Sequence, residues 1–224
     1  ESRGEDWERQ MLIKADYLCG SESLYNKFSD SVSRFIYPAT FSVSPVEQIK
    51  KLKASIEQRS KSEDNIKFIS GGIRDIEFSL QALQLLNGGK DFRIRTGNSL
   101  DAIDKLLNKN ILSEEEAKIF KSAYVFYRRV EHYLQLMNDQ QTHTIPAEGE
   151  VVEKLAHFLN FKDLKSFKKK LNISKDKVQS IYNSIVGIKD SADGKNDFYK
   201  ITFIDFKRAK SNFEYLRTGK SLFD

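Results

Sequence analysis

The chain has 224 residues, of which 39% are hydrophobic and 31% are charged, a composition typical of a folded protein with one or two domains. Its formal net charge of +5 is mild and dispersed, which argues against a nucleic-acid-binding protein. With 3 prolines and 11 glycines, the chain has too few turn residues for an all-β fold. It contains no run of about 18 apolar residues, so we expect neither a membrane span nor a secretion signal.

Cys19 is the only cysteine, so no internal disulfide can form, and a reduced, cytoplasmic setting is expected. A lone cysteine without a local nucleophile pattern is expected to be a small buried residue. The chain does not begin with methionine, which suggests a processed chain or a fragment. We expect no metal site, because no histidine has a second ligand at metal-binding spacing; the histidines are His132, His143 and His157.

Helical periodicity dominates the chain from its beginning. The stretch Ser44-Pro45-Val46-Glu47 combines a capping serine, a first-turn proline and a capping-box glutamate, and it predicts a helix start. The stretch 66–69 predicts a short extended piece before a pair of glycines. In chain order, helices are expected over 5–19, 22–36, 45–58, 73–87, from about 99, and then over 113–139, 151–159, 164–171, 175–186 and 205–218.

The helix expected over 113–139 is the longest and carries two apolar stripes. One stripe includes Ala123 and Val130, and the other includes Phe120 and Tyr127. A helix that is apolar over such a wide arc is typical of the centre of a bundle. The pattern therefore predicts an all-α fold, a multi-helix bundle of about nine helices with one long central helix.

The helix after Gly71 and Gly72 has a charged first turn, formed by Arg74, Asp75 and Glu77. Backbone amides at a helix start attract anions, and Arg74 offers a bidentate contact to a phosphate. The alternative is an Arg74–Glu77 ion pair that locks the helix to a neighbour. Spacing alone favours the ion pair.

Two further groups of charged residues have structural explanations. Glu131 falls within an apolar stripe, where an unpaired carboxylate would be costly, so we expect a buried pair with an arginine from another helix. Arg128 and Arg129 lie beside it in the sequence. At the amino end, three charged residues surround the apolar stripe of an ordinary amphipathic helix; they are Glu8, Arg9 and Lys14.

Three separate stretches resemble one family, glutamine synthetase adenylyltransferase, the bifunctional bacterial enzyme that adds and removes AMP. They occur in the family's order, and together with the helices beyond them they cover most of the chain. The stretches are DWERQMLIKA (6–15), NIKFISGGIRDIEFSLQALQLLNGGKDFRIRT (65–96) and AYVFYRRVEHYLQLMNDQQTHTIP (123–146).

The resemblance implies an enzyme of two halves, each a nucleotidyltransferase domain followed by a helical bundle. One half removes AMP from a glutamine synthetase tyrosine by phosphorolysis, giving ADP, and the other attaches AMP from ATP. The arginine in IRDIEF (73–78) resembles the adenylyl-removing half. The family's metal-binding G-S-x-D-x-D motif does not occur in these 224 residues. The resemblance therefore implies no catalytic or metal-binding residue in this chain, an inactive fragment, and Mg²⁺ held by an upstream domain of the parent.

On this resemblance, residues 1–20 connect to the upstream domain, residues 21–188 form the bundle, and residues 189–224 form a linker and a terminal helix. The expected partners are glutamine synthetase, the PII signalling protein and, through the parent enzyme, ATP, ADP and phosphate. The alternative is a non-catalytic module that binds glutamine synthetase or PII. The candidates for a shared cleft or an interdomain contact are Glu8, Arg9, Lys14, Gly71, Gly72, Arg74, Asp75 and Glu77.

Overall fold

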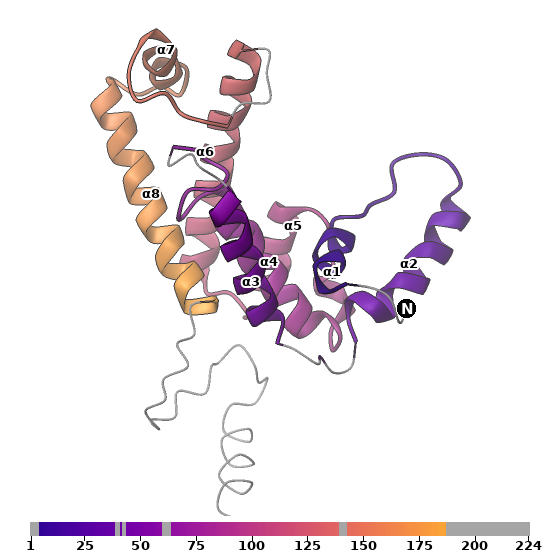
Figure 1. Cartoon of the computed structure of the whole chain (residues 1–224). Coiled ribbons are helices and arrows are strands. Elements are labelled where there is room, and N and C mark those ends of the chain that lie inside the picture. Colours follow the sequence, from indigo (N-terminus) through magenta and orange to yellow (C-terminus); the bar gives the residue numbers. More distant parts are fainter. Residues whose placement is uncertain (1–4, 39–40, 42–43, 60–63, 139–142, 187–224) are drawn as a thin grey trace, which may run out of the picture. The chain divides into compact units, whose positions relative to one another are not determined.

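The fold is built from helices alone. The computed structural model describes residues 5–38, 41, 44–59, 64–138 and 143–186, all within the compact unit formed by residues 1–188. In these ranges the only extended pairing is an isolated antiparallel bridge between Asn65 and Thr144, so the predicted all-α class is confirmed. In chain order (Figure 1), the elements are α1 (Asp6–Ile13), α2 (Glu22–Ile36), α3 (Pro45–Arg59), α4 (Ile73–Gly88), the 3₁₀ helix η1 (Phe92–Ile94), α5 (Ser99–Asn108), α6 (Glu114–Asn138), α7 (Glu150–Phe158) and α8 (Leu164–Ile185).

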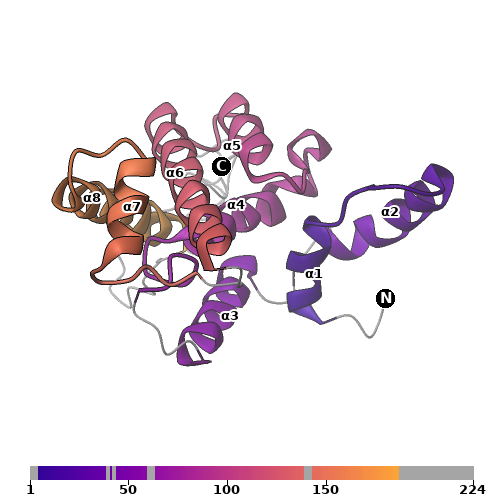
Figure 2. The ribbon, with the colours of Figure 1, turned by 90° about the horizontal axis from the view of Figure 1, so that it is seen from above.

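Helix α4 lies at the centre of the bundle, and 12 of its 16 residues are buried. It packs against α3, α5, α6, α8 and η1, and both views show it enclosed by these helices (Figures 1 and 2). Because α4 is covered on most sides, four of its polar residues are buried as well and need internal partners: Asp75, Ser79, Gln81 and Gln84. The Asp75 carboxylate lies 2.6 Å from the Lys53 ammonium and accepts a hydrogen bond from the Gly71 amide at 2.7 Å.

Helix α6 buries residues of both predicted stripes, as a central helix should. Phe120, Tyr127 and Val130 have no exposed surface, and the helix contacts α4, α5, α7 and α8. The predicted bounds of this helix, residues 113–139, agree closely with the observed bounds Glu114–Asn138. The helix predicted over 205–218 and the linker before it lie outside the described residues, and the predicted division at residues 20 and 188 stays a prediction.

Helix α1 is shorter than predicted, ending at Ile13 rather than near residue 19. The Asp16 carboxylate accepts a hydrogen bond from the Tyr17 amide at 2.8 Å, a local arrangement that competes with a helical turn. Without that turn Cys19 does not reach the core. It is exposed, and the expectation of a buried cysteine was wrong.

Two other local predictions were also wrong. Residues 66–69 form turns, not an extended piece, since the amides of Phe68 and Ile69 both donate to the Asn65 carbonyl. Residues 164–186 were expected to form two helices, yet α8 runs unbroken. The residues between the two expected helices include neither glycine nor proline, and Ser174 among them is buried in the packing of α8. None of the helices in the described ranges is long and apolar enough to cross a membrane.

Gly71 allows α8 to pack directly on the start of α4. Its φ is +74°, and a Cβ there would lie 2.1 Å from the Lys175 carbonyl oxygen, which is backbone and cannot move away cheaply. We expect Gly71→Ala to lower the free energy of unfolding by at least about 3 kcal/mol, measured by urea denaturation.

The matched control is Gly149→Ala. Gly149 has a φ of +110° and a ψ of 175°, a conformation that costs alanine about 1–3 kcal/mol, but nothing lies within 4 Å of its missing Cβ, so a smaller loss than in Gly71→Ala is expected. Equal losses in the two variants would contradict the close packing of α8 on Gly71.

Candidate functional site

A pocket of about 720 Å³ opens beside α4 and is lined by segments that are far apart in the sequence. Helices α1, α3, α4 and α6 contribute, together with the start of α5. Its walls are part apolar and part charged. Its lining residues include Trp7, Gln10, Lys14, Lys67, Arg74, Glu77, Phe78, Gln81, Ser99, Tyr124 and Arg128.

One face of α4 forms the main wall. Glu77 and Phe78 lie three and four residues after Arg74, and Gln81 lies four and three residues after them, which places all four on the same side of the helix. Gln84 continues this stripe but serves a different purpose. Its amide donates to the carbonyls of residues 94 and 96, at 3.1 and 2.9 Å, and so holds the segment that leads to the start of α5.

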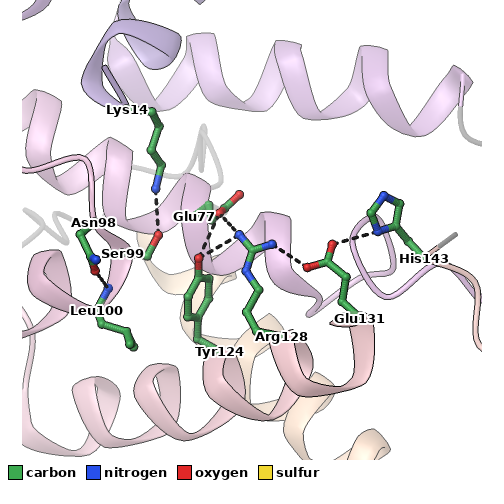
Figure 3. Close-up of polar contacts among 9 residues, drawn as sticks. All are labelled: Lys14, Glu77, Asn98, Ser99, Leu100, Tyr124, Arg128, Glu131 and His143. Carbon is green, nitrogen blue, oxygen red and sulfur yellow. Dashed lines mark hydrogen bonds and ion pairs between the residues drawn. The ribbon is translucent and has the colours of Figure 1, made fainter. Parts of the chain in front are cut away.

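Arg128 is the centre of a chain of polar contacts along the pocket (Figure 3). Its Nη2 lies 2.9 Å from Glu77 Oε1 and 2.9 Å from the Tyr124 hydroxyl, and its Nη1 lies 2.6 Å from Glu131 Oε2. The other oxygen of Glu131 lies 2.9 Å from His143 Nδ1. Burial lowers the pKa of Arg128, but hydrogen bonds to Glu131 and Tyr124 outweigh this and raise it, so the guanidinium stays charged.

The buried Glu131 was expected to pair with an arginine of another helix, and this was wrong. Its partner, Arg128, belongs to the same helix, three residues earlier. The other end of the Arg128 guanidinium reaches the neighbouring helix instead, at Glu77. Arg128 can serve both carboxylates because the guanidinium presents several N–H donors in one plane.

Three further cations line the pocket, and in the described part of the chain none of them has an ion-pair partner: Lys14, Lys67 and Arg74. Lys14 is exposed as a residue, but its ammonium donates to the Ser99 hydroxyl at 2.8 Å, and the loss of water there lowers its pKa against the opposing effect of Glu77. The pocket therefore holds more positive than negative charge.

The Arg74 guanidinium is held by aromatic rings. It lies 5.1 Å from the ring centre of Phe68 and 5.3 Å from that of Phe78, within the range of cation–π attraction. Burial lowers the pKa of Arg74, and the nearby Glu77 carboxylate opposes that shift. The Arg74–Glu77 ion pair that the spacing favours is not formed in the described structure, where Glu77 pairs with Arg128.

Several buried polar atoms in the pocket wall have no hydrogen-bond partner. The side-chain carbonyl oxygens of Gln10 and Gln81 are unpartnered, although these residues are only 4% and 7% exposed. The Nε of Arg74 is also buried and unpartnered. Buried polar groups in folded proteins nearly always have partners, so three unpartnered atoms in one pocket call for an explanation.

The glycine pair itself does not form an anion cradle. The backbone amides of Gly71, Gly72, Ile73 and Arg74 all donate within the protein, to the Asp75 carboxylate and to the carbonyls of residues 69, 66 and 67. A Cβ on Gly72 would lie 2.5 Å from the Ile66 carbonyl oxygen, so this glycine serves close packing. Any anion in this pocket would have to bind side chains.

Several of the charged candidates do not line the pocket. Glu8 caps α1 by accepting a hydrogen bond from the Glu5 amide, and Arg9 ties α1 to α2 by donating to the Phe35 carbonyl at 2.9 Å. Arg129 is exposed and lies over the ring of Phe158. The structure thus brings together Lys14, Arg74, Glu77 and Arg128 and separates them from Glu8, Arg9, Gly71, Gly72, Asp75 and Arg129.

Some pocket residues were not predicted. Gln10 lies on the same face of α1 as Trp7 and Lys14, so helical spacing could have identified it. Lys67 lies in a turn whose position depends on the tertiary fold. No three metal-ligating side chains come together in the described ranges, so these residues do not fit a Mg²⁺ site and we derive no step through that metal.

Comparison with known protein families shows which family the chain matches. Residues 45–186, well over half of the sequence, match the family model described as GlnD PII-uridylyltransferase. The chain belongs to this family. It is therefore a helical domain of a nucleotidyltransferase-related family. The match runs from the start of α3 to just beyond the end of α8, so it includes every segment of the pocket except α1.

The contacts of Arg128 predict a large loss of stability on truncation. Arg128→Met would leave the carboxylates of Glu77 and Glu131 without their shared cation in a mostly buried setting. We expect the free energy of unfolding to fall by about 3 kcal/mol, the lower end for a broken buried pair because the Arg128 side chain is 30% exposed.

The adjacent Arg129→Met is the control. It removes the same charge from the exposed side of α6 and should change stability by less than about 0.5 kcal/mol in the same denaturation experiment. Adding Glu131→Gln to Arg128→Met should recover part of the loss. If Arg128→Met and Arg129→Met are equally stable, Arg128 does not hold the carboxylates of Glu77 and Glu131.

Proposed function

We propose that the chain is the helical domain of the adenylyl-removing half of glutamine synthetase adenylyltransferase, where it supports phosphorolytic removal of AMP from glutamine synthetase. The observation that carries this proposal is the convergence of the three resembling stretches on one pocket. Stretch 6–15 contributes Lys14, stretch 65–96 contributes Arg74 and Glu77, and stretch 123–146 contributes Arg128. Residues so far apart in sequence share one pocket, as expected if they serve one function.

In this proposal the domain backs an upstream nucleotidyltransferase domain, which would hold Mg²⁺, and the pocket faces the substrate side of the cleft between them. Exposed apolar side chains on the two first helices support such a contact. Trp7, Met11, Leu24 and Phe28 are all at least 44% exposed in the described structure. Large apolar side chains exposed on two helices that contact each other suit a protein–protein interface.

A second candidate is that the parent transfers UMP to the PII protein. The matching family description favours it, because it names PII-uridylyltransferase. A third, from another class, is a non-catalytic module that binds glutamine synthetase or PII. The apolar surface on α1 and α2 is equally compatible with that role.

The proposal is tested by joining the chain to its upstream domain and measuring AMP release from adenylylated glutamine synthetase with phosphate. We expect activity in the joined protein and none in the isolated chain. Transfer of UMP to PII from UTP, with no AMP release, would favour the second candidate. Binding of glutamine synthetase or PII by the isolated chain, with no activity of the joined protein, would favour the third.

Arg74→Ala in the joined protein examines the pocket directly. We expect phosphorolysis to slow by about tenfold or more, because a hydrogen bond from a charged group contributes about 1.5–3 kcal/mol. Arg129→Ala is the matched control and should leave the rate unchanged. If Arg74→Ala alters neither rate nor stability, the pocket has no part in the reaction.

A further inference from the structure

We infer that the outer face of α8 binds an acidic segment of a partner protein, one that carries carboxylates on both sides of an apolar side chain. Three observations carry the inference: the net positive charge of the chain lies in this helix, the protein does not neutralise it, and an apolar side chain is exposed among the lysines.

The net charge of the chain is concentrated in α8. The whole chain has 37 basic and 32 acidic residues, and α8 accounts for six of the former and one of the latter. The rest of the sequence therefore carries equal numbers of basic and acidic residues, so the excess positive charge is not dispersed. The six lysines are Lys165, Lys168, Lys169, Lys170, Lys175 and Lys177.

The outer face of α8 carries a row of lysines. Helix α8 runs along one flank of the bundle and packs against α4, α6 and α7 (Figure 1). Four exposed residues follow one another on its outer face at four-residue spacing, namely Lys165, Lys169, Ile173 and Lys177. At a rise of 1.5 Å per residue this row is about 18 Å long.

The protein itself does not neutralise these lysines. In the part of the chain that the structure describes, none of the six forms an ion pair. Asp176 is the one acidic residue of α8, and no lysine lies three or four residues from it. Lys165, by contrast, has Lys168 and Lys169 at the spacings where like charges repel and weaken a helix. Local arrangements that oppose the stability of the fold are typical of functional surfaces.

Ile173 indicates what lies between the carboxylates of the partner. It is 42% exposed and stands in the row between Lys169 and Lys177. An apolar side chain of the partner would cover it while carboxylates reach the ammonium groups on either side. An extended peptide presents alternate side chains on one face about 6.6 Å apart, close to the rise of about 6 Å between neighbours in the row.

The composition of α8 favours a protein segment over a nucleic acid. The helix has no arginine, the side chain that contacts a phosphate through two parallel hydrogen bonds. Its aromatic residues, Phe167 and Tyr182, are both buried, so neither can stack on a base. Ammonium groups around an aliphatic side chain suit carboxylates around another aliphatic side chain.

The test uses the 224-residue chain and a labelled peptide in which glutamate alternates with alanine and one leucine replaces the central glutamate. Binding is measured by fluorescence anisotropy. We expect saturable binding of this acidic peptide, and weaker binding at about 200 mM salt than at about 50 mM, because salt screens exposed charges. A peptide with lysine in place of glutamate and an oligothymidylate of equal charge should each bind at least about tenfold more weakly. A peptide with serine in place of the leucine should bind about threefold more weakly.

Absence of saturable binding of the acidic peptide would overturn the inference, and the row would then be a solvated helix face. Oligothymidylate binding as tight as that of the acidic peptide would overturn it in favour of a nucleic acid. No residue of α8 lines the pocket beside α4, so the inference goes beyond the proposed function and does not depend on it. If the joined protein releases no AMP, the proposed function fails and this surface stands; if the peptide does not bind, only this inference fails.

A charge reversal places the carboxylates of the peptide. Lys169→Glu should weaken the acidic peptide by about tenfold or more, because it puts a like charge in the middle of the row. It should not lower the melting temperature, since it replaces the repulsion between Lys165 and Lys169 by an attraction. Lys27→Glu, at an exposed lysine of α2, makes the same change of net charge and should leave the affinity unchanged. Equal effects of the two variants would overturn the placement on α8.

A second variant places the leucine of the peptide. Ile173→Ser should weaken the acidic peptide by about threefold and leave the serine peptide unaffected. Leu136→Ser, at an exposed apolar residue of α6, is the matched control and should change neither affinity. An affinity for the acidic peptide that is unchanged in Ile173→Ser would overturn the apolar part of the site.

Discussion

The pocket depends on the two-sided contact of Arg128. One guanidinium holds Glu77 of α4 at 2.9 Å and Glu131 of its own helix at 2.6 Å, so it fixes α4 against α6 along the pocket wall. The same contact also sets the net charge of the pocket. Because Arg128 neutralises Glu77, the pocket keeps an excess of positive charge from Lys14, Lys67 and Arg74.

Much of the fold follows from local sequence patterns. Helix α5 begins at Ser99, as expected, with Asn98 as its cap, and the two apolar stripes of α6 correctly predict its central position. The errors occur where another interaction, local or tertiary, overrides the helical pattern. Asp16 hydrogen-bonds to the next amide and ends the helical region early, while α8 continues because tertiary packing covers Ser174, a residue with only modest helix propensity.

The site was only partly predictable. Helical spacing places Arg74 and Glu77 on one face of α4, but spacing cannot say that Glu77 would pair with a residue 51 positions later in the chain. Lys67 joins the pocket through a turn, which periodicity does not describe. The glycine pair shows the opposite case: a helix start that resembles an anion site in the sequence has its amides bonded within the protein.

The most direct test of the account is a crystal structure of the chain. The account predicts that Arg128 contacts Glu77 of α4 and Glu131 of α6 together, and that Lys14 and Arg74 line one pocket with them. A structure in which Arg128 contacts only one of the two carboxylates, or in which Lys14 and Arg74 lie in separate places, would contradict it.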